Sequence, residues 1–234
     1  LDTRMEGLET TGAAVAYGGK YGLMRWPRPK EPSGWQLNLS GAVFAQFDLE
    51  SPSMDLINAD YTIGFPVSYR HGDNSLRLRL YHQSSHLGDE FLLRTEPERV
   101  NLSYESLEAL YARDIGTWRL YAGGEYFLHR QPRSLGSGGW HAGLDYRRPQ
   151  PWWPGSEGGG VYPVMGVDTK AFEHHDWKPG WSVTAGVELH PELPGRGQDK
   201  YMSVLAVWYD GPSPFGQFFT EAVNYWGLSL EFNL

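Results

Sequence analysis

The sequence contains no cysteine, and this absence excludes disulfide bonds, thiol nucleophiles and cysteine-ligated metals. It also has no apolar run of about 18 residues, so it encodes no transmembrane helix. Basic residues are in the minority, with 20 Lys and Arg against 28 Asp and Glu, and the net charge of −8 argues against nucleic acid as a partner. No signal-peptide pattern opens the chain at Leu1, as expected of a processed protein.

Aromatic residues and glycine, by contrast, are abundant. The chain has 10 Trp, 14 Tyr and 29 Gly in 234 residues, a length that suits one β-barrel domain covering 1–234. Its mean hydropathy is negative, at −0.49. That value does not oppose a membrane barrel, because only every second residue of each strand faces lipid.

Period-two alternation is the dominant pattern. In "WQLNLSGAVFAQFDLE" (35–50), apolar residues alternate with mostly polar ones, and the pattern recurs in 61–70, 118–129 and 181–189. These runs often reach about ten residues and begin or end with an aromatic, whereas soluble strands average about 5–6 residues. We therefore expect an all-β, antiparallel transmembrane β-barrel. A soluble lipocalin-like barrel, which would alternate too, is the alternative.

The chain carries about eleven strand-like segments. They lie near 12–25, 35–49, 58–70, 75–86, 98–112, 116–129, 138–148, 160–172, 180–190, 200–210 and 222–234. Bacterial single-chain barrels have even strand numbers, so we expect ten or twelve. The segment 12–25 is the weakest, because "YGGKYG" could break it. The last segment ends "NYWGLSLEFNL" and is similar to the final strand that the barrel-assembly machinery reads, although Leu234 stands where Phe is usual.

The final strand also predicts which connections share an end of the barrel. If it ends in the periplasm, the opposite end carries the connections near 50–57, 86–97, 130–137, 172–179 and 211–221. The tight turns "HGDN" and "RDIGTW" then lie at the periplasmic end, where short turns belong. The longer connections 149–159 and 191–199 share that end.

The second face of the alternating strands is rich in charge of both signs. Its members are Asp48, Arg70, Arg77, Arg79, Arg119, Glu125, Asp145, Arg147, Asp168, Lys170, Glu188 and Glu231. A barrel of this size has a narrow lumen, where an unpaired charge is costly. We expect Arg79 and Arg119 each to reach a lumen carboxylate. The lumen would then be filled by ion pairs or keep a small polar pore.

The stretch "YHQSSHLGDE" carries the strongest catalytic candidates. His82 and Ser84 continue the face of the leucines in "SLRLRL" and should point outward near the membrane rim. Serine becomes nucleophilic when a histidine takes its proton, and a third polar group must orient that histidine. Glu96 and Glu98 are the candidates for this third role, because they share parity with Val100, Leu102 and Tyr104 at the start of the next strand and could face lipid beside His82. The alternative is a polar strand end in the headgroup zone.

A metal site is a second interpretation of the same region. His82, His86, Asp89 and Glu90 would meet His174, His175 and Asp176 on neighbouring extracellular loops, and nitrogen and oxygen ligands of this kind suit divalent metals. Histidines and acids in loops are usually just solvated, so we expect no metal and no cofactor.

Five motifs carry a resemblance to a known family. "SMDLINADY", "YHQSSHLGDEFLLR", "RVNLSYES", "EHHDW" and "SPFGQF", in this order, resemble the bacterial family called domain of unknown function 1207, a group of outer-membrane barrels of Gram-negative bacteria. The resemblance covers roughly 35–234. It implies the barrel fold and the outer membrane, and it implies no activity.

A second resemblance concerns His82 and Ser84 alone. Outer-membrane phospholipase A and lipid A 3-O-deacylase carry a similar His-x-Ser strand motif, with Asn or Glu on the next strand as the third catalytic residue. Both usually have Asn after the serine, where this chain has Ser85.

Two functional hypotheses follow. The first is a structural, narrow-channel or partner-binding barrel of the envelope, in contact with outer-membrane phospholipid or lipopolysaccharide and inserted by the barrel-assembly machinery. The second is an outer-leaflet lipid hydrolase that uses His82, Ser84 and Glu96 or Glu98.

Overall fold

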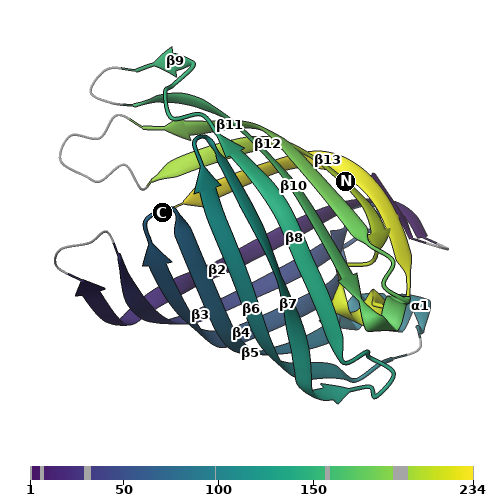
Figure 1. Cartoon of the computed structure of the whole chain (residues 1–234). Coiled ribbons are helices and arrows are strands. Elements are labelled where there is room, and N and C mark those ends of the chain that lie inside the picture. Colours follow the sequence, from purple (N-terminus) through teal and green to yellow (C-terminus); the bar gives the residue numbers. More distant parts are fainter. Residues whose placement is uncertain are drawn as a thin grey trace.

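The chain forms one large antiparallel sheet that curls into a barrel (Figure 1). The computed structural model describes residues 2–5, 8–28, 33–97, 99–155, 159–191 and 200–233, with side chains from Thr11 onward. Its long strands are β2 (Leu8–Arg28), β3 (Ser33–Asp48), β4 (Leu56–His71), β5 (Asn74–Leu87), β6 (Leu102–Ile115), β7 (Trp118–Gln131), β8 (Gly138–Arg147), β10 (Gly160–Phe172), β11 (Gly180–His190), β12 (Tyr201–Pro212) and β13 (Ala222–Asn233). The predicted all-β antiparallel architecture is confirmed.

Five short elements complete the fold. They are the strands β1 (Asp2–Met5) and β9 (Trp153–Pro154), the helix α1 (Asp89–Thr95) and the 3-10 turns η2 (Glu173–His175) and η3 (Gly216–Phe218). None of the helices in the described ranges is long and apolar enough to cross a membrane.

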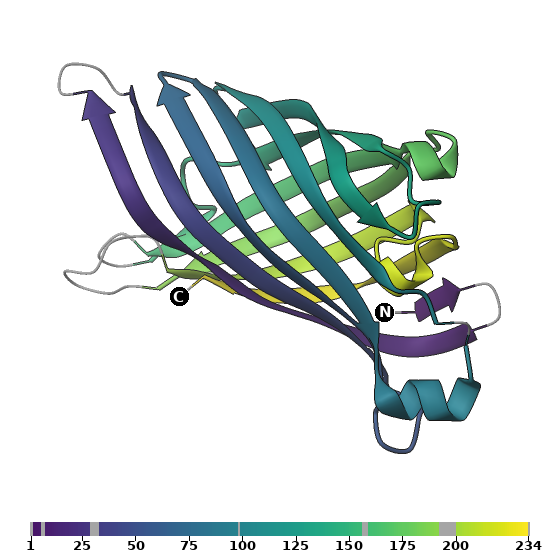
Figure 2. The same ribbon diagram turned by 90° about the horizontal axis from the view of Figure 1, so that it is seen from below.

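The ring of strands closes through β1. This strand pairs antiparallel with β13 on one side and with β2 on the other. Beyond Thr11, within the described part of the chain, β2 pairs only with β3, and β13 beyond Trp226 pairs only with β12. The two unpaired edges form a seam (Figure 2). With β1 included, the ring has twelve strands, and twelve is one of the two numbers expected from the sequence.

The first long strand differs from its prediction in length and regularity. It was expected over 12–25, with "YGGKYG" as a stretch that could break it, but β2 runs unbroken for 21 residues. Its register against β3 shifts between Gly22 and Met24, so Leu23 is an extra, bulged residue. A bulge changes which face the following side chains occupy. Arg25 therefore pairs opposite Gln36 and shares the inward face of Lys20.

The connections gather at the two ends as the sequence predicted. One end, the loop end, carries the connections 49–55, 88–101, 132–137, 173–179 and 213–221, with α1, η2 and η3. The other, the hairpin end, carries the turns at 72–73 and 116–117 and the connections that follow β8 and β11. Figure 1 shows α1 far from the C-terminus, on opposite ends of the barrel.

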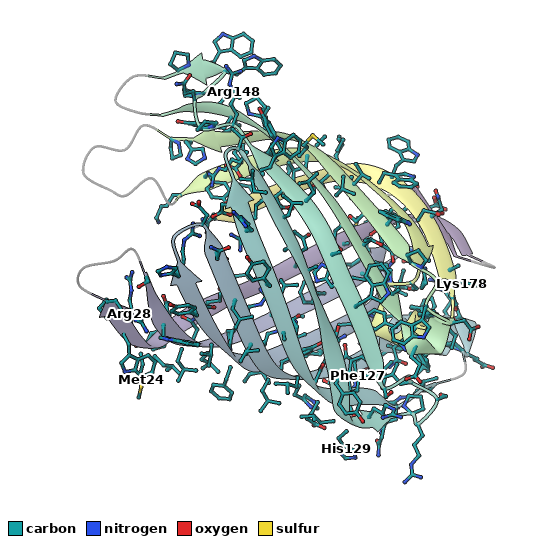
Figure 3. The ribbon with its side chains drawn as sticks, viewed as in Figure 1. Met24, Arg28, Phe127, His129, Arg148 and Lys178 are labelled. Carbon is teal, nitrogen blue, oxygen red and sulfur yellow. The ribbon has the colours of Figure 1, made fainter. Side chains whose placement is uncertain are left out.

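The two faces of the strands differ in chemistry. The outward face exposes large apolar side chains, among them Ile63, Phe65, Leu78, Leu80, Leu107, Leu120, Leu228 and Leu230. The inward face buries polar ones, including Asn38, Gln46, Asn58, Asp60, Ser106, Glu108 and Glu188. This is the reverse of a soluble domain, and Figure 3 shows side chains projecting from both faces of the ribbon.

An apolar cluster, which we call the plug, lies in the lumen at the loop end. We define it by Leu102, Phe127, Leu135 and Phe219, which pack into one buried cluster. The connection that carries η3 folds inward here, and the Gly216 amide donates to Asp60 Oδ2 at 3.0 Å. A Cβ at Gly216 would lie 2.6 Å from the Ser85 side chain, so only glycine permits this close approach.

Candidate functional site

A ladder of ion pairs crosses the middle of the lumen. Arg79 lies directly opposite Glu108 in the register of β5 and β6, and its Nη2 donates to Glu108 Oε2 at 2.8 Å. Arg77 reaches the other carboxylate oxygen, Oε1, with its Nη2 at 2.9 Å. Glu108 is only 7% exposed. One buried carboxylate therefore serves two arginines.

The second predicted pair is also present. Arg119 Nη1 lies 3.0 Å from Asp114 Oδ1, and Arg70 contacts the other oxygen of the same carboxylate. The prediction that Arg79 and Arg119 each meet a lumen carboxylate is confirmed. It held because alternation and strand pairing are local, so parity alone assigns both side chains to the lumen.

Further pairs extend the ladder around the ring. Tyr121 donates to Asp168 Oδ2 at 2.6 Å, and His141 contacts the same oxygen. Arg147 Nη2 lies 2.6 Å from Glu188 Oε2. Several charges on the strands from β5 to β11 are thus paired inside the lumen, where an unpaired charge is costly.

The ion pairs do not fill the lumen. A cavity of about 800 Å³ remains, and it is lined by charged residues such as Arg79, Glu125 and Lys170 and, towards the loop end, by aromatic residues of and around the plug. A second cavity of about 570 Å³ lies towards the hairpin end. Both volumes fall in the range of small-molecule sites, about 300–1,000 Å³.

Ion pairs also hold the helix α1 against the loop end of the barrel. Arg94 of α1 bridges two buried carboxylates, with Nη2 at 2.8 Å from Asp48 Oδ2 and Nε at 2.8 Å from Asp55 Oδ2. The hydrogen bond from Ser53, together with those from Arg94 and Ser51, holds the pKa of Asp55 below its ordinary value. Across the barrel, Glu173 accepts hydrogen bonds from the Ser137 backbone and hydroxyl, which lower the Glu173 pKa.

His174 packs beside the plug. Its ring stacks on Phe172 at 5.3 Å between centroids and meets Phe219 edge-on at 5.7 Å. Its Nδ1 is buried and has no hydrogen-bond partner among the described residues. Burial, with the neighbouring His175 as a smaller cause, lowers the pKa of His174 to about 4.

The catalytic candidates His82 and Ser84 lie on the outer face. His82 Nδ1 is 2.8 Å from Glu105 Oε1 on the next strand, and His129 Nδ1 is 3.4 Å from the other oxygen of Glu105. Ser84 pairs opposite Ser103 in the register of β5 and β6. Within the described ranges, no hydrogen bond joins Ser84 to His82, whose ring bonds to Glu105.

The two predicted acid partners lie elsewhere in the chain. Glu96 caps the C-terminus of α1 in the left-handed conformation, with φ of 44°, and Glu98 is outside the described residues. Their proposed role stays a prediction. The parity argument grouped them with Leu102 and Tyr104 on the lipid face, and that facing is wrong. Leu102 and Tyr104 turn into the lumen, where both line the larger cavity beside Phe127.

Glu105 was missed by the sequence analysis. Its partnership with His82 depends on the register between β5 and β6, which are joined through α1 and the residues that follow it. A two-residue hairpin would have set this register from the sequence alone, but a connection of this length leaves it open. The usable signal was the His-x-Ser resemblance, which asks for an acid on the next strand.

The residues of the metal interpretation are distributed over two environments. His82 bonds to Glu105 on the outer face, while His174 packs in the aromatic surroundings of the plug. Among the residues that the structure describes, no group of three or more His, Asp or Glu side chains is arranged to hold a metal ion.

Comparison with known proteins gives a family without an assigned activity. No curated protein and no solved structure matches the chain. A model of a protein family of unknown function, DUF1207, matches residues 3–234. Because this match extends over nearly the whole chain, the protein belongs to the DUF1207 family.

Proposed function

We propose that this protein is an outer-membrane β-barrel of Gram-negative bacteria whose lumen forms a narrow polar channel, stoppered at the loop end by the plug. The proposal rests on the difference in chemistry between the outer face and the lumen. An apolar band surrounds the barrel while paired charges occupy its inside, which is the arrangement that a lipid environment favours.

Aromatic residues border the apolar band on both sides. On the hairpin side they are Trp35, Tyr69, Tyr111, Trp118 and Tyr146, and on the loop side Tyr61, Tyr126, Trp140, Trp181 and Trp208. From Tyr61 to Tyr69, β4 rises about 26 Å along the strand, or roughly 20 Å across the membrane at a tilt of about 40°. This is close to the band of about 25 Å in outer-membrane barrels. The tight turns favour a periplasmic hairpin end.

The retained cavity supports a channel more than a purely structural barrel. A lumen filled by the ion-pair ladder would leave no path, whereas about 800 Å³ remains open beside it. The plug then acts as the barrier at the loop end. Its apolar side chains hold the end closed without a covalent link, so it is able to open.

Planar-bilayer conductance tests the channel. We expect small or infrequent currents from the wild-type protein and larger ones from a Leu135→Ala/Phe219→Ala variant, because truncation of two plug residues opens the loop end. Leu93→Ala is the matched control, since Leu93 is 80% exposed on α1. Equal currents from the plug variant and the control would contradict a stoppered channel.

The membrane location is tested separately. The folded protein should need detergent or lipid, and it should migrate differently on gels before and after heating, as folded barrels do. Brominated lipid should quench the fluorescence of exposed tryptophans such as Trp208 and Trp226. A monodisperse protein in detergent-free buffer would contradict the proposal.

A second candidate function is an outer-leaflet lipid hydrolase, and one observation favours it. The carboxylate of Glu105 sits 2.8 Å from His82 Nδ1, which is the position of the group that orients a catalytic histidine. The other ring nitrogen, Nε2, would then take the proton of Ser84, two residues along the same outward face, as Ser84 attacks a lipid ester.

Hydrolysis of phospholipid and lipid A in mixed micelles tests this candidate. Ser84→Ala and His82→Ala should abolish the activity, and single Glu→Gln changes at positions 96, 98 and 105 should identify the orienting acid. Ser103→Ala is the matched control, because Ser103 faces Ser84 across the same strand pair. A wild-type rate equal to the protein-free blank would reject the hydrolase and leave the channel standing.

A further inference from the structure

The second cavity, at the hairpin end, has an unusual lining. It holds about 570 Å³, and six basic residues border it: Lys20, Arg25, Arg28, Arg70, Arg77 and Arg119. We call this the basic vestibule. Among the described residues that line it there is no Asp or Glu. In a chain of net charge −8, this concentration of positive charge does not follow from composition.

The carboxylates behind the vestibule neutralise only part of its charge. Asp114 serves both Arg70 and Arg119, and Glu108 serves both Arg77 and Arg79. Two carboxylates thus face four guanidinium groups. The shared pairing also fixes the arginine side chains in position, which lowers the entropy lost when they bind a further anion.

Lys20 and Arg25 supply positive charge that no carboxylate among the described residues offsets. Within the described part of the chain, neither has an ion-pair partner, and both side chains are exposed. The bulge at Leu23 is what turns Arg25 to the same side as Lys20. β2 therefore presents two free cations across the vestibule from the arginines of β4, β5 and β7.

Uncharged donors complete the lining. Ser68, Ser75 and Gln36 border the same cavity, and Arg119 Nη2 donates to Ser75 Oγ at 3.1 Å. Guanidinium groups match the oxygens of phosphate in bidentate geometry, and hydroxyl and amide donors add neutral hydrogen bonds. Several cations spread over four strands suit a ligand with more than one charged oxygen group.

We propose that the basic vestibule binds a soluble small molecule that carries two or more phosphate charges. The cavity faces the lumen, so a water-soluble ligand fits it better than a lipid headgroup does. Because binding at equilibrium requires only the folded barrel, this site goes beyond the proposed channel and does not depend on conductance.

Calorimetric titration with inorganic pyrophosphate, in nonionic detergent at low ionic strength, tests the site. Wild-type protein should bind it, and added salt should weaken the binding. Lys20→Gln/Arg25→Gln should bind pyrophosphate at least about tenfold more weakly than the wild type, because two charge-assisted contacts are lost. Lys20→Arg/Arg25→Lys keeps both charges and should restore affinity to within about threefold.

The matched control is Arg113→Gln/Arg133→Gln, which removes the same charge from two exposed positions outside the vestibule. It should bind like the wild type, and gel migration before and after heating should show that every variant folds.

No binding by wild-type protein, or equal loss in both double variants, would overturn the site. Displacement of pyrophosphate by phosphatidic acid in mixed micelles would overturn the assignment to a soluble ligand. If binding holds while conductance fails, the channel alone is rejected.

Discussion

Glu108 is the carboxylate that pairs with two arginines inside the lumen. It stands between Arg77 and Arg79, which share one face of β5, and it is 7% exposed. Glu108→Gln should lower the free energy of unfolding by about 2–3 kcal/mol, because two neighbouring cations lose their shared partner. The loss stays below that of a fully buried pair, since the arginine side chains are 33% and 29% exposed. Guanidinium unfolding in micelles measures it, with exposed Glu90→Gln expected to change little.

His174 should make the plug sensitive to acid. Its pKa is lowered from 6.5 to about 4, so the closed plug holds the neutral ring while an opened loop end takes up a proton. Closure is therefore fully stable above pH 6.5 and weakens as the pH falls towards 4. His175, whose pKa is also lowered by burial, adds to the same window, whereas Asp55 and Glu173 lose their contribution only at lower pH.

Hydrogen exchange of the amides in 213–221 measures this effect. Between pH 6.5 and 4.5, after correction for intrinsic rates, protection should fall in the wild-type protein and fall less in His174→Phe, which keeps the ring packing. Amides of β5 serve as the internal reference. An unchanged pH dependence in His174→Phe would show that another group controls the plug.

Single residues were predictable from the sequence where the reasoning stayed within a strand. The inward facing of Arg79 and Arg119 needed only alternation, and the structure pairs both. The acid beside His82 needed the register between two strands that a long connection separates. Alternation alone therefore could not identify Glu105 as the partner of His82. It also assigned Leu102 and Tyr104 to the lipid face, whereas both line the lumen.

Among the elements, β2 shows how one extra residue decides a binding surface. Leu23 is surplus to the ladder, so its deletion should leave Lys20 and Arg25 on the inward face and should preserve both folding and pyrophosphate affinity. Deletion of Leu78 is the control, because β4 and β5 pair without a register shift. It should exchange the faces of half of β5 and prevent folding. Loss of affinity on deletion of Leu23 alone would show that the bulge itself shapes the site.

The same strand explains why element boundaries were harder to predict than element type. Glycines in "YGGKYG" weaken a strand, yet β2 continues through them because β3 pairs with it along nearly its whole length. A bulge leaves no local signature in an alternating sequence. Strict alternation counted from Lys20 would place Arg25 on the outward face, whereas the register with β3 places it on the inward face.

At the scale of the whole molecule, the ring closes between β2 and β13 through the short strand β1. Both strands are antiparallel to β1, so they are parallel to each other, and β1 separates them only at the loop end. Amide and carbonyl groups left unpaired in hydrocarbon cost several kcal/mol each, and this cost opposes the separation that β1 imposes at the loop end. The strand number, expected as ten or twelve, depends on this closure and could not be derived from periodicity alone.

Cysteine cross-linking shows whether the edges meet. The chain has no cysteine, so an introduced pair is unambiguous. Thr11 and Trp226 both face Asp2, and Ala14 and Ser229 lie three residues further along the seam. Two strand spacings, about 9–10 Å, separate such positions, beyond the Cα separation of about 7 Å that a disulfide tolerates.

Ala14→Cys/Ser229→Cys should therefore stay reduced in lipid bilayers, while Ala185→Cys/Ala206→Cys, on directly paired residues, should oxidise. A disulfide between positions 14 and 229 would mean that β2 and β13 pair in parallel and that the barrel closes with eleven long strands, because β1 could then no longer keep them apart.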